Sequence, residues 1–274
     1  MSEITKKAWT NEELEYLKNN YLAKTTKELS IELNRSESAT QTKLQKMGLK
    51  RPDKYQYDVD YFKNIDTNEK AYWLGFWFAD GFVSGNEATI ELQEQDKYIL
   101  ERLNKDVKGN LPLQRVLRER EYNHRIIKSD SYKIRFRRKE FIDNLINQGC
   151  VPNKTHTLNF PKNVPNNLMN DFIRGYFDGN GCVCAIKDRK EIRFYFSSGS
   201  HTMLVGIQDE LQKNGISSHI RPQVGKCENL IITGITNTKN FAKYIYDNAE
   251  LYLDRKFNKF KYYYDLYDLQ CRGR

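Results

Sequence analysis

The sequence lacks the segments that would place the protein in a membrane. Its longest apolar runs fall far short of the ~20 residues that a helix needs to cross a bilayer, and no charged and then apolar leader stands at its N-terminus. Cysteine is sparse as well, with five residues, an odd number, and no C-x-x-C pair. These absences argue against a disulfide framework or a zinc site and favour reduced thiols. We therefore expect a cytosolic or nuclear protein without membrane attachment.

Two of the cysteines, Cys182 and Cys184, stand at alternate positions. In a strand they would point to the same face of a sheet, but two sulfurs alone make a poor metal site. We interpret them as structural cysteines.

Acidic residues are outnumbered by basic ones. The chain holds 45 Lys and Arg against 36 Asp and Glu, a formal net charge of +9, together with 18 Tyr. A basic excess with many aromatic side chains favours a polyanionic partner such as nucleic acid, although a solvated basic face would give the same totals. At 274 residues the chain can bury a sizeable core, as one large domain or two unequal ones.

Residues 1–50 carry the signals of three short helices. Capping boxes mark the starts of the first two helices, Thr10 with Glu13 and Thr25 with Glu28. Ser36 and Gly48 mark the start and the end of the third. Short helices with tight connections predict a helix-turn-helix domain. Residues 51–58, which are polar and contain a proline, are expected to form a linker.

The third of these helices has the composition of a DNA-contacting helix. Ala39 and Leu44 should face inward, and the outward positions suit a major groove and its phosphates: Gln41, Lys43 and Lys46. The segment also resembles Myb/SANT-like DNA-binding domains in the pattern Trp9-Thr-x-x-Glu, Leu29, Arg35-Ser and Gly48-Leu. A small three-helix module that binds protein is the alternative.

After the linker the sequence repeats itself with a period of about 100 residues. AYWLGFWFADGFV (71–83) and DFIRGYFDGNGCV (171–183) each read as a helix running into a turn, and strand-like and helical segments follow in the same order. Phe141 and Phe241 also lie 100 residues apart. The repeated unit, helix, two strands, helix, two strands, helix, predicts an α+β fold with an internal pseudo-twofold axis. The two halves would span residues 59–165 and 166–274.

Small residues recur on one face of the two opening helices. Gly75 and Ala79 are four positions apart, as are Gly175 and Gly179, so each pair shares a helix face. Glycine inside a helix costs about 0.5–1 kcal/mol relative to alanine, a cost that close approach of two backbones would offset. We infer that the helices pack against each other at the axis and bring their C-terminal ends together. Two unrelated buried helices with ordinary C-cap glycines are the alternative.

The paired segments resemble the single-chain, two-motif LAGLIDADG homing endonucleases. WLGFWFADG (73–81) and IRGYFDGNG (173–181) match the family's nonapeptide, and the flanking NKTHTLNFPKNVPNNLMNDFIRGYFDG and YLDRKFNKF resemble intein-type and phage or intron members. The resemblance covers about residues 58–265. It implies a monomer of two αββαββα halves whose sheets form a saddle over double-stranded DNA. It also implies a cytoplasmic, nucleoid-associated protein of a bacterial or phage-infected cell.

The resemblance further implies a catalytic centre. The acidic metal ligand before the last glycine of each motif corresponds to Asp80 and Asn180, and lysines near the end of each half correspond to Lys154 and Lys256. These residues would act with Mg²⁺, or another divalent cation such as Mn²⁺ or Ca²⁺, in hydrolysing phosphodiester bonds. From spacing alone, each lysine could equally be a phosphate contact or a solvated surface residue.

Asn180 departs from the family's pattern, because an amide oxygen can ligate a cation but carries no charge. An asparagine at position 180 is compatible with three interpretations: an exchange made to trap uncut DNA, a natural variant that nicks or cuts slowly, or a retired nuclease kept as a regulator. Since the rest of FDGNG is intact, we expect a site-specific double-stranded DNA endonuclease whose cleavage is weak or absent in this chain. A non-cleaving DNA-binding transcriptional regulator and an RNA maturase are the alternatives.

Basic residues gather in the strand-like segments of both halves. Residues 113–140 hold ten Lys and Arg against four acids, and in SYKIRFRRK the alternation should turn Ile134 and Phe136 to the core and basic residues outward. Strands with outward Arg and Lys can lie along a major groove. The predicted DNA contacts are Arg115, Arg118, Arg120, Lys133, Arg135, Arg137, Arg193 and Arg221. An exposed charged sheet face without a DNA partner is the alternative.

Overall fold

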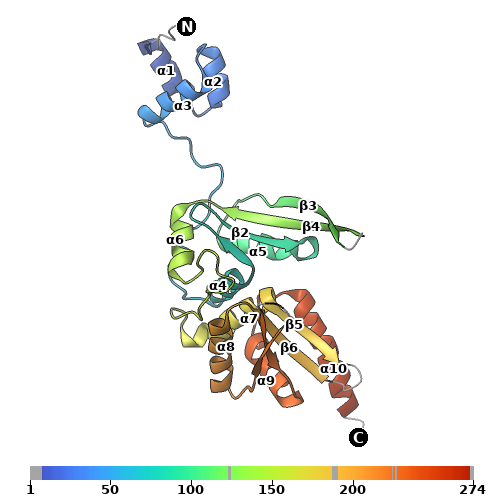
Figure 1. Ribbon diagram of the computed structural model, residues 1–274. Coiled ribbons are helices and arrows are strands. Elements are labelled where there is room, and N and C mark those ends of the chain that lie inside the picture. Colours follow the sequence, from blue (N-terminus) through green and yellow to red (C-terminus); the bar gives the residue numbers. More distant parts are fainter. Residues whose placement is uncertain (1–7, 123–124, 187–190, 224, 226, 272–274) are drawn as a thin grey trace. The chain divides into compact units, whose positions relative to one another are not determined.

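The computed structural model describes residues 8–122, 125–186, 191–223, 225 and 227–271 (Figure 1). The chain divides into two compact units, Met1–Lys54 and Tyr55–Arg274. Within the described ranges, no helix is both long and apolar enough to cross a membrane.

The first unit consists of three short helices, α1 (Asn11–Asn20), α2 (Thr26–Glu32) and α3 (Glu37–Lys46). The capping boxes predicted at the starts of α1 and α2 are confirmed, with the threonine and glutamate of each box accepting each other's backbone N–H. Ser36 caps α3, and Gly48 follows that helix with a φ of +68°, a conformation that favours glycine. Leu17, Leu29 and Leu44 form the core between the three helices.

Residues 51–58, the predicted linker, are anchored to the unit on either side of the boundary at residue 54. The guanidinium of Arg51 donates to three acceptors between the end of α1 and the start of α2, which ties it to the first unit. Tyr57 is buried in the second unit, where its hydroxyl accepts the backbone N–H groups of Arg137 and Arg138. Composition does not reveal these anchors, because an arginine that binds carbonyls and a single buried tyrosine look like linker residues in a sequence.

The second unit contains one arrangement of elements twice. The first copy comprises α4 (Asn68–Asp80), β1 (Gly81–Val83), β2 (Ala88–Gln93), α5 (Lys97–Asp106), β3 (Gln114–Tyr122), β4 (Arg125–Phe136) and α6 (Lys139–Asn147). The second comprises α7 (Met169–Asn180), β5 (Gly181–Ile186), β6 (Glu191–Ser198), α8 (His201–Lys213), β7 (His219–Pro222), β8 (Glu228–Ile232) and α9 (Ile235–Tyr246), and α10 (Asp254–Cys271) follows. The predicted α+β tandem fold is thereby confirmed.

Each half builds a four-stranded antiparallel sheet. The strand orders are β1-β2-β4-β3 and β5-β6-β8-β7, so the two sheets have the same topology. Their registers correspond as well, with Gly81 opposite Ile90 in the first sheet and Gly181 opposite Phe196 in the second. Figure 1 shows one sheet on either side of α4 and α7, which lie between the two halves.

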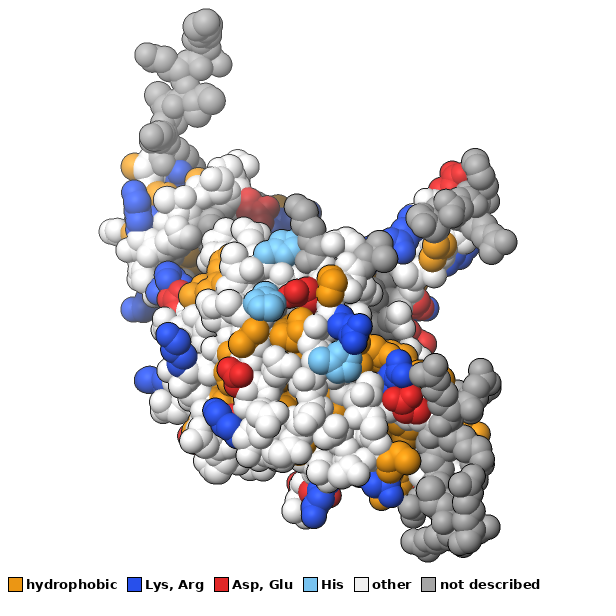
Figure 2. All heavy atoms as spheres, turned by 60° about the horizontal axis from the view of Figure 1, so that its bottom comes forward, with side chains coloured by type: hydrophobic (Ala, Val, Ile, Leu, Met, Phe, Trp, Pro, Cys, Tyr) orange, Lys and Arg blue, Asp and Glu red, His pale blue; other side chains and the backbone are white. Residues whose placement is uncertain are grey.

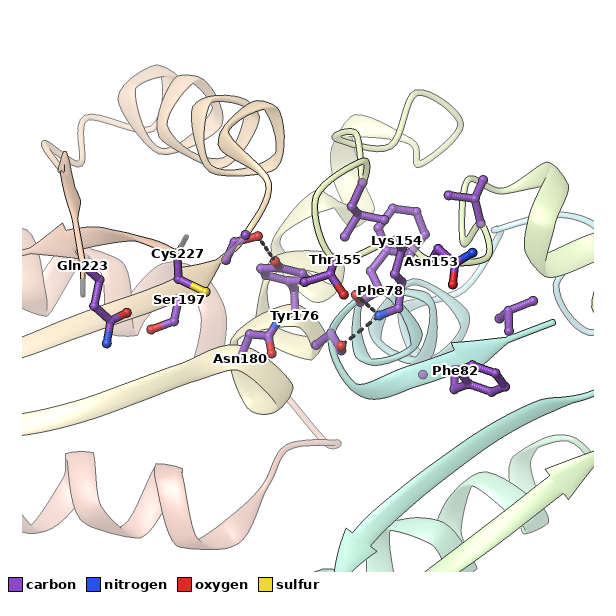
Figure 3. A pocket seen from close by; sticks show the side chains of 17 residues that line it. Phe78, Phe82, Asn153, Lys154, Thr155, Tyr176, Asn180, Ser197, Gln223 and Cys227 are labelled. Atoms are coloured by element: carbon purple, nitrogen blue, oxygen red, sulfur yellow. Dashed lines mark hydrogen bonds between the residues drawn. The ribbon is translucent and has the colours of Figure 1, made fainter. Parts of the chain in front are cut away.

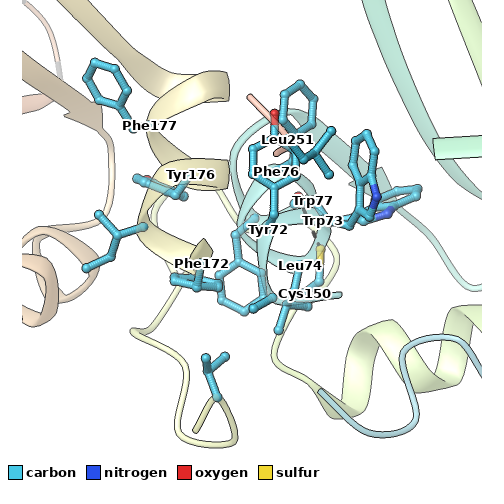
Figure 4. Packing of buried hydrophobic residues seen from close by; sticks show 14 of the residues in the cluster. Tyr72, Trp73, Leu74, Phe76, Trp77, Cys150, Phe172, Tyr176, Phe177 and Leu251 are labelled. Atoms are coloured by element: carbon cyan, nitrogen blue, oxygen red, sulfur yellow. Dashed lines mark hydrogen bonds between the residues drawn. The ribbon is translucent and has the colours of Figure 1, made fainter. Parts of the chain in front are cut away.

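The hydrophobic core runs through both halves, and α4 and α7 contribute to its centre (Figure 4). Every residue of α4 from 71 to 78 is buried, as expected for a helix that is packed on all sides. The two phenylalanines 100 residues apart occupy matching places in the two halves. Phe141 contacts Trp77 of α4 with ring centroids 6.2 Å apart, and Phe241 contacts Phe177, the corresponding residue of α7, at 5.7 Å. The core therefore has the same internal symmetry as the sheets.

Candidate functional site

The opening helices of the two halves, α4 and α7, touch backbone to backbone. A Cβ atom added to Gly75 would lie 2.0 Å from the carbonyl oxygen of Phe172, and one added to Gly175 would lie 1.9 Å from that of Tyr72. Real Cβ atoms essentially never approach another heavy atom within 3.0 Å, so neither position has room for a side chain. The absence of side chains at these two positions is what allows the helices to approach so closely.

The two helices also end side by side. A Cβ atom added to Gly179 would lie 2.2 Å from the Cβ of Ala79 and 3.2 Å from Oδ2 of Asp80. Because α4 ends at Asp80 and α7 at Asn180, the carboxylate of one helix lies against the last turn of the other. The Asp80 side chain is exposed and that of Asn180 is half-buried. The structure thus brings positions 80 and 180 to the same end of the helix pair.

Two lysines reach these helix ends from outside the motifs. Lys154, in the loop after α6, donates through Nζ to the carbonyl oxygens of residues 78–79 of α4. Lys256, in the first turn of α10, donates to those of residues 177–179 of α7, at 2.8, 2.6 and 3.3 Å in that order. Each lysine therefore binds the C-terminal end of its own half's motif helix, where the helix dipole favours a cation.

Desolvation and neighbouring charges set the electrostatics of this site. Partial desolvation raises the pKa of the Asp80 carboxyl although its side chain reaches solvent, and the ammonium groups of Lys256 and Lys154 oppose that rise. Burial lowers the pKa of Lys154, and it lowers the pKa of Lys256 to about 8, although the carboxylate of Asp178 favours the charged amine. Two ammonium groups beside one exposed carboxylate create a field that suits an anionic phosphate.

Asp178 is a candidate for a residue that supports the site, and the sequence interpretation missed this residue. Its side chain is buried, and its Oδ2 accepts the Tyr72 hydroxyl at 3.0 Å and the backbone N–H of Leu253 at 2.8 Å. Burial raises the pKa of Asp178 to about 6, and the charge of Lys256 opposes this rise most strongly. Asp178 thereby joins α7 to α4 and to the segment that precedes Lys256. A signal existed in the sequence, since this carboxylate of IRGYFDGNG stands where the first motif has Phe78.

A pocket of about 680 Å³ opens beside the paired helix ends (Figure 3). Phe82 and Lys154 line it from the first half of the unit, and Tyr176, Asn180 and Ser197 line it from the second. Within the described part of the chain, Nζ of Lys154 has two acceptors, so its third N–H is available to a group bound in the pocket. The ammonium of Lys154 from the first half and the amide of Asn180 from the second half therefore line the same pocket.

The register of the first sheet places four of the predicted DNA contacts on one face. Lys133 and Arg135 alternate with buried residues of β4, so they point to the outer face of the sheet. Arg118 and Arg120 of β3 stand opposite Ser129 and Ile127 of β4. Because those two positions lie an even number of residues from Lys133, the two arginines share its face. An acidic residue accompanies them, since Glu91 forms ion pairs with Arg118 and Lys133. The face is thus less positive than its number of basic residues suggests.

Arg115 and Arg137 are not part of this group. Arg115 stands opposite Tyr132, on the core side of β3, and forms an ion pair with Asp130 at 2.5 Å. In LQRVLRER no buried residue marks the alternation, so the sequence does not reveal which basic residues of this strand face outward. Arg137 follows the end of β4 and is exposed.

The second sheet has a matching outer face. Ile192, Phe194 and Phe196 of β6 are buried in the core, so Arg193, which stands between Ile192 and Phe194, lies on the opposite face of the sheet. The register adds Arg221 of β7 to that face. Arg193 forms an ion pair with Glu191 at 3.0 Å. On the side of the molecule shown in Figure 2, Lys and Arg side chains are likewise interspersed with Asp and Glu rather than gathered in one patch.

The three predicted contact residues of α3 differ in their surroundings. Gln41 and Lys46 are exposed and Lys43 is half-buried. The Gln41 side chain accepts the Thr26 hydroxyl at 3.1 Å, and the ammonium of Lys43 lies 6.0 Å from the centre of the Trp9 ring. Gln41 and Lys43 therefore also help to hold the first unit together.

The donor set at the helix ends fits a hard divalent cation. Asp80 offers a carboxylate and Asn180 an amide oxygen, the kinds of ligand that Mg²⁺, Mn²⁺ and Ca²⁺ prefer. Among the residues that the structure describes, no group of three or more His, Cys, Asp or Glu side chains could hold a metal ion. Water and phosphate oxygens would have to complete the coordination, which Mg²⁺ accommodates because it keeps several waters.

Comparison with known proteins identifies the fold. A family model described as a LAGLIDADG-like domain matches residues 167–246, which include α7 to α9 of the second half. The solved structure of the homing endonuclease I-WcaI bound to its DNA recognition sequence is similar, with a TM-score of 0.51 at 12% sequence identity over 72% of this chain and 90% of that one. This similarity extends across both halves and shows the tandem LAGLIDADG fold.

Further structures are similar at lower scores. The meganuclease I-SmaMI bound to uncleavable DNA with a TTGT central four has a TM-score of 0.48 at 11% identity, over 74% of this chain and 90% of that one. The N-terminal LAGLIDADG domain of DUF199/WhiA has a TM-score of 0.45 at 15% identity, over 72% of this chain and 93% of that one. No curated protein matches the sequence.

Proposed function

We propose that this chain binds double-stranded DNA on the outer faces of its two sheets and is a metal-dependent DNA endonuclease whose cleavage is weak or absent. One observation carries the proposal: Asp80 lies against Gly179, the residue before Asn180 in the last turn of α7, where two helices are packed backbone to backbone. Lys154 and Lys256 are fixed at the same helix ends. Such a centre can act on phosphodiesters at the axis between the two sheets. The LAGLIDADG-like domain and the fold shared with I-WcaI support it.

Each residue of this centre has a distinct part. Asp80 and Asn180 would hold a divalent cation, which supplies activation of water and stabilisation of charge on phosphoryl oxygens when bound. Lys154 can direct its remaining N–H at a phosphate oxygen in the pocket, whereas Lys256 contributes positive charge from a position fixed by three carbonyls. Asp178 is a positioning residue, because it holds the segment preceding Lys256 against α7.

The amide at position 180 is the reason to expect weak cleavage. Two unit charges ~4 Å apart interact by about 4 kcal/mol at an effective dielectric constant of 20. Losing one carboxylate should therefore weaken the binding of a divalent cation by at least about tenfold, even after screening. The helix contact and both lysines are in place around Asn180, so the deficit is one of charge rather than of architecture.

The amide of Asn180 also favours a second function, binding of DNA without cleavage. A chain that binds duplex DNA without cutting it would act as a transcriptional regulator, and such a protein has no need of a second carboxylate at position 180. An RNA maturase would instead bind structured intron RNA in preference to duplex DNA. Competition between duplex DNA and intron RNA for the chain separates this last alternative from the other two.

The first unit would supply an additional DNA contact. It has three helices, and the last of them, α3, exposes Gln41 and Lys46, as the recognition helix of a helix-turn-helix domain would. A domain tethered to a DNA-binding neighbour acts at a high effective concentration. We therefore expect removal of residues 1–54 to weaken binding and to shorten the protected site, without abolishing either.

The test of the proposed activity is cleavage by N180D. Randomised duplex DNA is first enriched by binding to the wild type, then incubated with Mg²⁺ and each variant, and new ends are counted by sequencing. We expect N180D to cut one class of sites at least about tenfold faster than the wild type, equivalent to ~1.4 kcal/mol of barrier. The matched control is D80N/N180D, which again has a single carboxylate and should cut slowly.

Two outcomes would contradict the proposal. If N180D binds the enriched DNA and does not cut it, the endonuclease assignment fails and the regulator stands. If no duplex is enriched and intron RNA is bound instead, the DNA-binding proposal fails in favour of the maturase.

A further inference from the structure

We propose that Cys182 and Cys184 are a redox modification site, whose oxidation to an intrachain disulfide weakens DNA binding. The effect on DNA rests on the proposed function, whereas formation of the bond does not. The two Sγ atoms lie 3.5 Å apart, with Cys182 exposed and Cys184 half-buried. Two thiols already in contact at the surface can react with each other once the strand bends locally. This proposal is an alternative to the interpretation of these two residues as structural cysteines.

The register places both thiols on the face assigned to DNA. Cys182 stands opposite Tyr195 and Cys184 opposite Arg193 in the pairing of β5 with β6, so they lie on the outer face of the second sheet. β5 begins directly after Asn180. A change at the thiol pair would therefore act both on a predicted DNA contact and on the strand that leaves the candidate cation site.

The spacing along the strand makes the disulfide attainable but strained. Residues two apart in a strand are separated by ~6.6–6.8 Å between Cα atoms, at the long end of the range of about 4.4–6.8 Å that disulfides occupy. Closing the bond requires β5 to bend locally between Cys182 and Cys184. Exposed and strained disulfides are easily reduced, which is the property of a reversible site rather than of a structural cross-link.

An external disulfide such as glutathione disulfide can act as the oxidant. The thiolate of Cys182, the more exposed of the two, attacks one of its sulfurs, forms a mixed disulfide and releases one glutathione thiolate. The thiolate of Cys184 then attacks the Cys182 sulfur, closes the intrachain bond and releases the second glutathione thiolate. The protons of the two protein thiols pass to the two leaving thiolates. Two electrons thus move from the protein to glutathione disulfide, and an excess of reduced glutathione reverses the reaction.

Mass spectrometry tests the bond itself. The full chain carrying C227S/C271S is treated with glutathione disulfide and digested with trypsin, which releases both cysteines in one peptide that follows Arg174. We expect this peptide to lose two hydrogen atoms, and C184S to carry a glutathione adduct at Cys182 instead. Cys150 serves as the internal control: it is buried, and burial raises its pKa to about 11. An unmodified peptide, or one with two glutathione adducts, overturns the proposal.

Binding of the enriched duplex DNA tests the consequence. Oxidation should weaken binding by roughly tenfold, dithiothreitol should restore it, and C182S/C184S should be insensitive to both reagents. An oxidised peptide with unchanged DNA affinity would overturn the link to binding. If the reduced protein does not bind DNA at all, the proposed function has failed, while the peptide mass still decides whether the disulfide forms.

Discussion

Replacing Gly175 by alanine should force the paired helices apart. The new Cβ would lie 1.9 Å from the carbonyl oxygen of Tyr72, whereas ordinary van der Waals contact begins at 3.4 Å, so the gap must grow by about 1.5 Å. Neither atom is the far end of a flexible side chain, because both belong to or are attached directly to helix backbones. Relief therefore requires α4 and α7 to separate, which disturbs the core on both sides.

The magnitude follows from two opposing effects. Alanine gains about 0.5–1 kcal/mol of helix propensity over glycine, and overpacking a core costs typically about 1–3 kcal/mol or more. With backbone against backbone, we place the overpacking at or above the upper end of that range, for a net loss of at least about 2 kcal/mol. For a unit of this size, such a loss lowers the melting temperature by about 4–8 °C.

Urea denaturation followed by tryptophan fluorescence measures this loss, because Trp73 and Trp77 are buried in α4. G85A is the matched control: an added Cβ there meets nothing within 4 Å and the residue has no positive φ, so stability should change by less than about 0.5 kcal/mol. If G175A were as stable as G85A, the close backbone contact between the two helices would be refuted.

Three further predictions concern DNA. Binding of the enriched duplex should weaken steeply with salt, with a slope of log affinity against log salt near −5 if about six basic residues of the two outer faces meet phosphates; a flat response would rule out the saddle. R118A should weaken binding by roughly tenfold and R115A by less than about twofold, since the two arginines lie on opposite faces of β3; equal losses would contradict the register. Cleavage by N180D should fall as pH rises through about 8, because burial lowers the pKa of Lys256 to that value and the lysine loses its charge there. Adding K256M to N180D should make cleavage slow at every pH. A rate that instead rises through pH 8 and is flat in K256M would assign Lys256 the role of a base.

The duplication made the fold predictable from the sequence. Two copies of one pattern give each helix and strand two independent chances to be recognised. Phe141 and Phe241 confirm the phase of the repeat, because each contacts the corresponding residue of its half's opening helix, Trp77 and Phe177. The capping boxes at Thr10 and Thr25 were equally readable, because they are local interactions between residues three apart.

Features that depend on long-range contacts could not be read in this way. The pair formed by Tyr72 and Asp178 joins residues 106 positions apart, and no local pattern announces it. The two lysines were assigned by resemblance, but their anchoring to helix carbonyls depends on how the loop before α7 and the start of α10 fold back. The face on which Arg115 lies depends on strand register, which the alternation of LQRVLRER does not determine.

The most direct measurement of the central claim is the affinity of Mn²⁺ for the complex of the chain with enriched duplex DNA, compared among four variants. The wild type and the swapped variant D80N/N180D each have one carboxylate at the paired helix ends, whereas N180D has two and D80N has none. If positions 80 and 180 share one cation site, the wild type and the swapped variant should bind Mn²⁺ alike. N180D should bind at least about tenfold more tightly, and D80N at least about tenfold more weakly. A swapped variant that behaves like D80N, or an N180D that behaves like the wild type, would contradict a shared site.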